Sequence, residues 1–469
     1  MLRQHLAIGL TTVCLLVVAY ADLSIAAEPI SIGSRRELFV DDFLIERLEG
    51  AARQRLERPE PREVVLVTDK PWEGNTCAYY TIFQDGKLYR MYYRGSHYDV
   101  ATRRAPHREV TCYAESKDGI HWTKPELGLF EFDGSKQNNI VADGIGTHCF
   151  APFKDANPDC PAEARYKALG RGEPRKNAGK HGLYAFQSPD GIRWSLMSDE
   201  PVITHGAFDS QNLAFWDSSR KCYADYHRHF RDGMRDIMTA TSSDFLKWTD
   251  PEFLVFSGAP RQQLYTNAVQ PCPHAPHLLI GFPTRYLANK AQQVEPTFMT
   301  SRDGLHFHRW PEALIPTDAP EDRDGNRSNY MTWGIVELPG HEGEYSVYAT
   351  EAYYTGPDSR VRRFAYRADG FVAIEAADGT GQLVTKPLTF DGDRLTINAV
   401  SAEGGEVRVE LQDADGHALP GFGLNDCQPF TGDAINHAIR WSGGRSLASL
   451  GGQPVRIRFQ LKNAKLYAM

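Results

Sequence analysis

The chain has 469 residues, of which 41% are hydrophobic, 24% charged and 11% aromatic, proportions typical of a soluble globular protein. Its formal net charge is −8 and its basic residues form no long run, which argues against nucleic acid as a partner. The eight cysteines include no Cys-x-x-Cys pair, so a zinc site of that kind is not indicated.

The first 27 residues have the pattern of a secretory signal peptide. The chain begins MLRQH, continues with the apolar run LAIGLTTVCLLVVAYA and reaches the small residues SIAA before Glu28, which predicts cleavage after Ala27. The apolar run has about sixteen residues, which is short for a membrane span. We therefore expect a secreted or periplasmic protein without a membrane span. The sequence leaves open whether Cys77 pairs with Cys112 and Cys149 with Cys160.

A short pattern then recurs along the chain. It reads YAESKDGIHW at Asp118, FQSPDGIRW at Asp190, TSSDFLKW at Asp244 and MTSRDGLHF at Asp303, with a weaker copy, YRADGFVAI, at Asp369. An Asp-Gly pair between strand-like flanks predicts a two-residue hairpin turn in which both residues have positive φ. Two more strand-like runs precede each copy, such as TCAYYTIF and KLYRMYY before the first. Each repeat is therefore predicted to be a four-stranded antiparallel meander.

Five such units arranged radially make a five-bladed β-propeller, which we assign to residues 28–375. Past residue 376 the repeat ends, and short alternating strands with Asp-Gly and Gly-Gly turns predict a small β-sandwich over 376–469. The predicted fold class is all-β, a five-bladed β-propeller followed by a small C-terminal β-sandwich. The alternative is a sandwich throughout, in which the Asp-Gly turns recur by accident.

The innermost strand of each blade begins at the propeller axis, and these beginnings are polar in all five repeats. They read Glu73-Gly-Asn75, Thr147-His148, Asp209-Ser-Gln-Asn212, Thr266-Asn267 and Asn326-Arg-Ser-Asn329. The second strands end in further polar groups, namely Arg94, Arg171, His227-Arg228-His229, Arg285 and Glu351. Amides and guanidinium groups of this kind bind sugar hydroxyls, so the ring of polar residues resembles a sugar pocket.

The export signal, the five repeats and the C-terminal sandwich together resemble those of known protein families. The chain resembles the five-bladed-propeller glycoside hydrolases of the arabinanase, xylosidase and levanase/invertase type. It is also similar to secreted planctomycete-type glycosyl-hydrolase-like proteins that contain ELFVDD, YAESKDGIHW, FDSQNLAFWD and GFPTRY. It lacks the Trp-x-Asn-Asp-Pro-Asn-Gly, Arg-Asp-Pro and Glu-Cys motifs of the levanase/invertase group, which argues against fructan as the substrate. The resemblance implies hydrolysis of O-glycosyl bonds in a plant or algal polysaccharide or oligosaccharide.

The resemblance also implies two or three axial carboxylates, because glycoside cleavage needs a proton donor and a second carboxylate. Asp209 is the first candidate, since it shortly precedes the strand NLAFW. Glu73 adjoins Trp72, and Glu351 interrupts an aromatic strand. Their structural alternatives are a turn or cap for Asp209, a solvated loop acid for Glu73 and a salt bridge with an arginine for Glu351. Glu295 ranks below these three.

Seven further residues are predicted to bind the substrate: Trp72, Asn75, His148, His227, Asn267, Arg285 and Asn329. No cofactor is predicted, although a structural divalent ion held by His227, His229 and Asp225 remains an alternative. The rival functional hypothesis is a non-catalytic carbohydrate-binding propeller, in which Arg285, Asn267 and His148 hold an anionic sugar. The sequence does not determine the oligomeric state.

Overall fold

The computed structural model describes residues 28–317 and 329–469, so the predicted signal peptide lies outside the described residues. The described chain is all-β, as predicted, and its helices are three short 3-10 turns, η1 (Ala162–Ala164), η2 (Pro174–Lys176) and η3 (Leu447–Leu450). Within the described ranges, no helix has the length and apolar character needed to cross a membrane.

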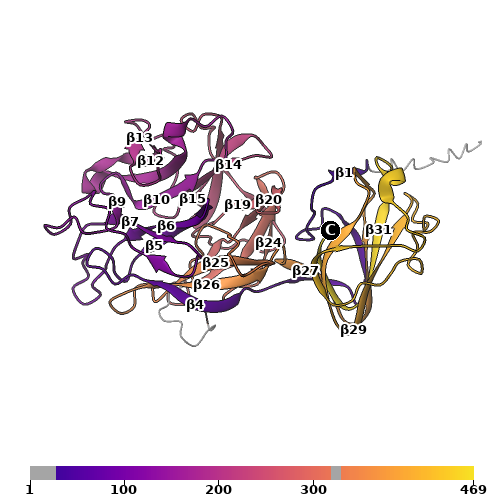
Figure 1. Cartoon of the computed structure of the whole chain (residues 1–469). Helices are drawn as coiled ribbons and strands as arrows, with labels where there is room; N and C mark the ends of the chain where they lie inside the picture. Colours follow the sequence, from indigo (N-terminus) through magenta and orange to yellow (C-terminus); the bar gives the residue numbers. More distant parts are fainter. Residues whose placement is uncertain (1–27, 318–328) are drawn as a thin grey trace, which may run out of the picture.

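Five sheets follow one another along the chain and form the larger of two bodies (Figure 1). The first contains β5 (Ala78–Asp85), β6 (Leu88–Gly95), β7 (Val110–Ser116) and β8 (Trp122–Thr123), with β9 (Ile140–Ala142) also on β7. The second contains β10 (Gly146–Lys154), β11 (Tyr166–Glu173), β12 (Ala178–Ser188) and β13 (Ser195–Leu196). The third contains β14 (Leu213–Asp217), β15 (Cys222–Arg231), β16 (Met234–Ser242) and β17 (Glu252–Phe253).

The last two sheets depart from the simple meander. The fourth has the order β18 (Val255–Ser257), β24 (His306–Trp310), β23 (Phe298–Ser301), β20 (Ala275–Gly281) and β19 (Gln270–Cys272), and the chain between β20 and β23 forms the hairpin β21 (Thr284–Leu287) and β22 (Gln293–Pro296). The fifth contains β25 (Glu344–Glu351), β26 (Arg360–Arg367) and β4 (Glu60–Val67). Its outer strand β4 therefore comes from the N-terminal part of the chain, and not from the segment after Asp369.

The recurring Ser-x-Asp-Gly motif forms a wider turn than the predicted two-residue hairpin. In the first copy only Gly119 has positive φ, +73°, and Asp118 does not. Ser116 Oγ accepts the amides of residues 118 and 119, while Asp118 Oδ1 accepts those of residues 120 and 121. The indole of Trp122 then donates to the carbonyl oxygen of Gly119. The motif is thus a side-chain-capped loop closed by its aromatic residue.

These turns also join neighbouring sheets. Tyrosine hydroxyls donate to turn carbonyl oxygens of the next sheet, from Tyr92 to Gly191 and from Tyr226 to Gly304. Tyr348 of the fifth sheet donates to Gly119 of the first, at 2.8 Å. The same two sheets meet again where Trp333 exchanges backbone hydrogen bonds with residues 80 and 82. The first and last sheets are therefore in direct contact.

The smaller body is built on a sheet with the order β2 (Ile45–Gly50), β27 (Val372–Thr385), β31 (Arg456–Ala468), β29 (Thr396–Gln412) and β30 (Asp433–Ala438) (Figure 1). β3 (Arg53–Leu56) also pairs with β27, and β1 (Ile30–Gly33) pairs with β28 (Leu388–Phe390). Residues 30–56, which the sequence analysis placed with the propeller, thus pair with C-terminal strands. The N-terminal segment and the C-terminal strands share one hydrophobic core, in which Phe39, Ile45 and Ala52 pack with Leu383 and Phe459.

Candidate functional site

One pocket of about 310 Å³ lies where the five sheets meet. The first four sheets contribute residues from the beginning of their first strand or the segment before it: Thr76 and Tyr79, His148, Asp209 and Tyr265. The fifth contributes Tyr330, which precedes the bridge between Met331 and Ala349 of β25. In an antiparallel meander, the start of the first strand, the end of the second and the start of the third lie at the same end of the sheet. The pocket is therefore lined by residues from that end of each sheet.

Seven tyrosines line this pocket: Tyr79, Tyr98, Tyr265, Tyr286, Tyr330, Tyr353 and Tyr354. All except Tyr79 form one chain of ring contacts, with centroids 4.8 to 6.1 Å apart in the order 286, 265, 330, 353, 354 and 98. We call these six the tyrosine belt. Aromatic rings with polar tips offer both a stacking face and a hydrogen bond, which suits a ligand with apolar faces and hydroxyl edges.

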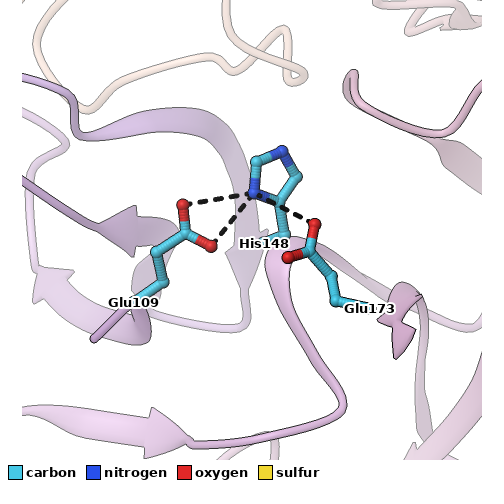
Figure 2. A group of neighbouring side chains, drawn as sticks. All are labelled: Glu109, His148 and Glu173. Carbon is cyan, nitrogen blue, oxygen red and sulfur yellow. Dashed lines mark hydrogen bonds and ion pairs between the residues drawn. The ribbon is translucent and has the colours of Figure 1, made fainter. Parts of the chain in front are cut away.

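His148 is the centre of a charged network in the pocket. Its Nδ1 lies 3.0 Å from Glu109 Oε2 and 3.8 Å from Glu173 Oε1, and Figure 2 shows the two carboxylates approaching this nitrogen from opposite sides. Its Nε2 lies 2.8 Å from Asp209 Oδ1. His148 therefore links the carboxylates of Glu109 and Asp209 through its two ring nitrogens.

Asp209 is the exposed carboxylate of the pocket, since 53% of its side chain is accessible. The hydrogen bond from His148 lowers the pKa of Asp209 well below its usual range, and the charges of His148, Arg228 and Arg171 act in the same direction. Arg171 Nη1 lies 3.7 Å from Asp209 Oδ1. The side chain is therefore an ionised carboxylate at neutral pH.

Glu109 is held more deeply on the other side of the imidazole. Burial opposes its ionisation, but hydrogen bonds and charges from His148, Arg94 and Lys176 outweigh burial and lower the pKa of Glu109. Lys176 Nζ lies 2.8 Å from Glu109 and 3.0 Å from Glu173. Glu109 is thus placed to orient His148 through Nδ1, leaving Nε2 to face Asp209.

The same three residues, Glu109, His148 and Glu173, have the spacing of a cation site, with one ligand atom of each within 4.8 Å of the others (Figure 2). Lys176 bridges both carboxylates, however, so a cationic group already lies beside them. The other site considered, at His227, is less suited. His227 Nδ1 lies 2.5 Å from Asp225, and Nε2 contacts the carbonyl oxygen of His205 at 3.0 Å.

Two predicted catalytic residues do not line this pocket. The side chain of Glu73 is fully buried and accepts hydrogen bonds from Tyr93 at 2.5 Å and Lys124 at 2.6 Å. Glu351, 1% exposed, pairs with Arg360 at 2.9 Å and with Arg362 at 2.7 Å. Glu351 thus forms a salt bridge with arginines, which was the structural alternative to a catalytic role.

Trp72 and Asn75 lie behind the pocket wall. The indole of Trp72 donates to Asn139 Oδ1, and its ring packs edge-on against Phe132. Asn75 Nδ2 donates to the carbonyl oxygens of Tyr98 and Gly356, and its Oδ1 accepts the amide of Tyr98. Asn75 therefore fixes two pocket loops rather than facing the ligand space.

The remaining predicted binding residues make internal contacts. Asn267 Nδ2 donates to the carbonyl oxygen of Tyr226, and Arg285 pairs with Glu295 at 2.6 Å. His227 is completely buried. Asn329 is buried with φ of +66°, and its side-chain amide has no hydrogen-bond partner among the described residues. Of the ten predicted site residues, Asp209 and His148 line the pocket together.

Sequence reasoning missed Glu109, Arg235 and most of the tyrosines. Glu109 directly precedes β7 and Arg235 lies at the start of β16, so both sit at the beginning of a third strand. The beginnings of third strands share an edge with those of first strands. The rule that selected Asp209 and Arg94, namely polar residues at the strand ends on one side of each sheet, would therefore also have selected Glu109 and Arg235 had it been applied to the third strands.

No protein-family model matches the chain. An uncharacterized protein of Mycobacterium tuberculosis, found in two strains, is 28% identical over 144 residues, which are 30% of this chain and 41% of that protein's length. Similar solved structures include a thermostable family-43 glycoside hydrolase (13% identity, 67% of this chain and 95% of that one, TM-score 0.45). A β-1,2-mannobiose phosphorylase from Listeria innocua is also similar (12% identity, 66% and 96% coverage, TM-score 0.46). Glycoside hydrolases, the group that the sequence resembles, are thus among these structures.

Proposed function

We propose that this protein is a carbohydrate-active enzyme that hydrolyses a glycosidic bond in the tyrosine-lined pocket, with Asp209 as the carboxylate that acts on the substrate. The observation that carries the proposal is the position of Asp209, an exposed and ionised carboxylate at the edge of a pocket lined by seven tyrosines. A pocket of about 310 Å³ has room for one or two sugar rings by the usual scale of small-molecule sites.

In this mechanism, the sugar stacks on the tyrosine belt and Asp209 faces its anomeric carbon. The carboxylate takes a proton from the attacking water and stabilises the positive charge that develops on the ring. The leaving oxygen takes its proton from solvent water, and His148 holds Asp209 in place through the 2.8 Å contact between its Nε2 and Asp209 Oδ1. Glu109 acts as a positioning residue, because it fixes the orientation of His148.

We also propose an architecture for the two bodies and a cellular location for the protein. We take the five sheets as the five blades of a propeller, with β4 completing the last blade, and the bent sheet of β27, β29 and β31 as the C-terminal sandwich. We propose that residues 1–27 direct export, so that the enzyme meets plant or algal polysaccharide outside the cytoplasm. The N-terminal residue of the mature protein, determined by mass spectrometry, tests the export step.

The activity is tested by measuring released sugar from pectic, arabinan, xylan and sulfated algal substrates with purified protein. We expect release from at least one substrate, and loss of that release in Asp209→Asn. The matched control is Asp118→Asn, which alters an aspartate in the first outer turn. Lack of release from every substrate, or full activity in Asp209→Asn, would contradict the proposal.

A second candidate, a non-catalytic carbohydrate-binding protein, is favoured by one specific observation. The two carboxylates that line the pocket, Asp209 and Glu109, both have a lowered pKa, so neither is a neutral proton donor at neutral pH. Glycosidases usually hold one protonated carboxyl. Tight binding of an oligosaccharide that is never cleaved, unchanged in Asp209→Asn, would support this candidate over the enzyme.

A further inference from the structure

We infer that the pocket is built for a sugar that carries a negative charge, a carboxylate or a sulfate group. This inference rests on the proposed function only in taking the ligand to be a carbohydrate. It comes from the arginines around the tyrosine belt, which exceed the carboxylates available to neutralise them.

Arg228 is the clearest case. It is 5% exposed, its Nε donates to the carbonyl oxygen of Ala207 at 3.1 Å, and its guanidinium lies 4.8 Å from the ring centroid of Tyr265. Within residues 28–317 and 329–469, it forms no ion pair. A buried cation without a counter-ion is costly in a folded protein. Its charge acts on Asp209, the exposed carboxylate of the pocket.

Arg235 lines the pocket itself. Its guanidinium lies 4.2 Å from the ring centroid of Tyr286 and 5.3 Å from that of Tyr265, and Nη1 donates to Gln263 Oε1 at 2.8 Å. Its Nε is buried without a hydrogen-bond partner, and no ion pair to it is found in the described part of the chain. These contacts, with the Phe230 ring at 5.7 Å, are all to neutral groups, so Arg235 keeps its charge and part of its donor capacity for a ligand.

Arg94 also lines the pocket. Its nearest carboxylate, Glu109, lies at 3.9 Å, whereas Nη2 donates to the carbonyl oxygen of Thr76 at 2.7 Å and to the Tyr353 hydroxyl at 3.0 Å. Its Nε is also buried without a partner among the described residues. Glu109 is meanwhile shared by His148 and Lys176. Arg94 is thus only weakly compensated.

The local balance of charge is therefore positive. Arg94 and Arg235 line the pocket together with Glu109 and Asp209. Directly behind this lining, three more cations, Arg171, Lys176 and Arg228, accompany a single further carboxylate, Glu173, before any charge on His148 is counted. The whole chain has the opposite sign, with a net charge of −8. A cationic pocket in an acidic protein attracts anions to that one place.

A charged sugar fits this combination better than a free anion does. The planar guanidinium group binds a carboxylate or sulfate through paired N–H donors. The tyrosine belt supplies aromatic faces for the sugar ring, which a bare phosphate or sulfate ion would leave unused. The chemistry of the pocket therefore indicates a uronic acid or a sulfated sugar.

Binding is tested by calorimetry on Asp209→Asn protein, so that turnover cannot consume the ligand. The probes are trigalacturonic acid, its fully methyl-esterified form and a sulfated galactan oligosaccharide. We expect at least one charged probe to bind about tenfold or more tightly than the neutral ester, with affinity that falls as salt is raised. The stronger charged probe identifies carboxylate or sulfate as the recognised group. Equal affinity for charged and neutral probes, or preference for the ester, would overturn the inference.

Arg235→Gln should remove most of the preference for charged probes, whereas Arg193→Gln should keep it. Arg193 is an exposed arginine paired with Asp190 in an outer turn, and it serves as the matched control. A preference that persists unchanged in folded Arg235→Gln protein would contradict the role of Arg235. The results also distinguish a failure of this inference from a failure of the proposed hydrolase activity. Charged sugars bound but never cleaved would support this inference and refute the hydrolase, and cleavage of a neutral glycan without charge preference would do the reverse.

Discussion

His148 Nε2 lies 2.8 Å from Asp209 Oδ1, although the two residues are 61 positions apart and belong to different sheets. His148 lies in β10, the inner strand of the second sheet, and Asp209 precedes β14, the inner strand of the third. The contact thus joins the pocket edges of two consecutive repeats. It fixes the protonation state of Asp209, because the hydrogen bond from the imidazole is the largest influence on the pKa of that carboxyl.

Asp209→Asn should lower kcat about 10²- to 10⁴-fold, the usual contribution of a group that transfers a proton in the reaction. The substitution preserves the shape of the side chain but removes its charge and basicity. The melting temperature at neutral pH should fall modestly, because the charged interaction of Asp209 with His148 is lost, but the protein should remain folded because 53% of the Asp209 side chain is exposed. Steady-state kinetics on the cleaved glycan and a thermal melt provide the two measurements. Activity within threefold of wild type would rule out a direct role for Asp209.

His148→Gln should move the acidic limb of the pH profile of kcat/KM to higher pH. The hydrogen bond and charge of His148 lower the pKa of Asp209, so their loss raises that pKa and the carboxylate becomes protonated at a higher pH. A group whose pKa is lowered by folding stabilises the protein above its unfolded pKa and loses that contribution as pH falls. The variant should therefore also lose less stability than wild type between pH 5 and about pH 2.

The control for this prediction is His121→Gln, which removes an exposed imidazole that pairs with Asp118 in an outer turn. Its kcat/KM profile should coincide with that of wild type. An acidic limb that stays in place in His148→Gln would show that Asp209 is not the group that titrates there.

The repeat and the all-β class could be predicted from the sequence because both are local. Ser116, Asp118 and Trp122 close their turn through contacts within seven residues, and the same contacts recur at Ser188, Asp190 and Trp194. The positions of β1 to β4 could not be predicted in this way. Their partners lie about 290 to 360 residues away in sequence, so no short pattern records the pairing.

The sequence predicted only part of the candidate site, because it indicates where a strand ends but not where each side chain points. Strand ends indicate which edge of a sheet a residue occupies, and this brought Asp209 and His148 to one pocket. Strand ends do not indicate where a side chain points. Glu351 ends β25 but faces Arg360 and Arg362 of the neighbouring strand, and Glu73 turns toward Tyr93 and Lys124 within the first sheet. Only the register between strands decides these directions.

Gly119→Ala should destabilise the fold by about 2 to 4 kcal/mol. A non-glycine residue at φ of +73° costs about 1 kcal/mol, and the added methyl group would lie 2.4 Å from Leu338 Cδ2, an overpacking that costs about 1 to 3 kcal/mol more. Gly119 also accepts the Tyr348 hydrogen bond that joins the first and fifth sheets. Chemical denaturation measures the loss.

Gly86→Ala is the matched control for Gly119→Ala. Gly86 has a similar φ of +63°, but a methyl group added there meets no atom within 4 Å. This variant should lose only the backbone contribution of about 1 kcal/mol. If both variants lost the same free energy of unfolding, the contact between the first turn and the fifth sheet would not contribute to stability.

Glu351→Gln should lower stability without impairing the chemistry. The carboxylate is 1% exposed and lies between Arg360, at 2.9 Å, and Arg362, at 2.7 Å. Removing one partner of a buried ion pair leaves the other charge uncompensated and typically costs about 3 to 5 kcal/mol. Because Glu351 does not line the pocket with Asp209, kcat of the folded protein should remain within about twofold of wild type, far from the losses expected of a proton-transfer group.

Glu200→Gln provides the comparison, because it breaks an ion pair with Lys180 in which both side chains are more than 60% exposed. An exposed pair contributes about 0 to 1 kcal/mol, so this variant should unfold at nearly the same denaturant concentration as wild type. The difference between the two variants isolates the effect of burial. A Glu351→Gln protein of normal stability with kcat reduced by orders of magnitude would instead return Glu351 to the group of catalytic carboxylates.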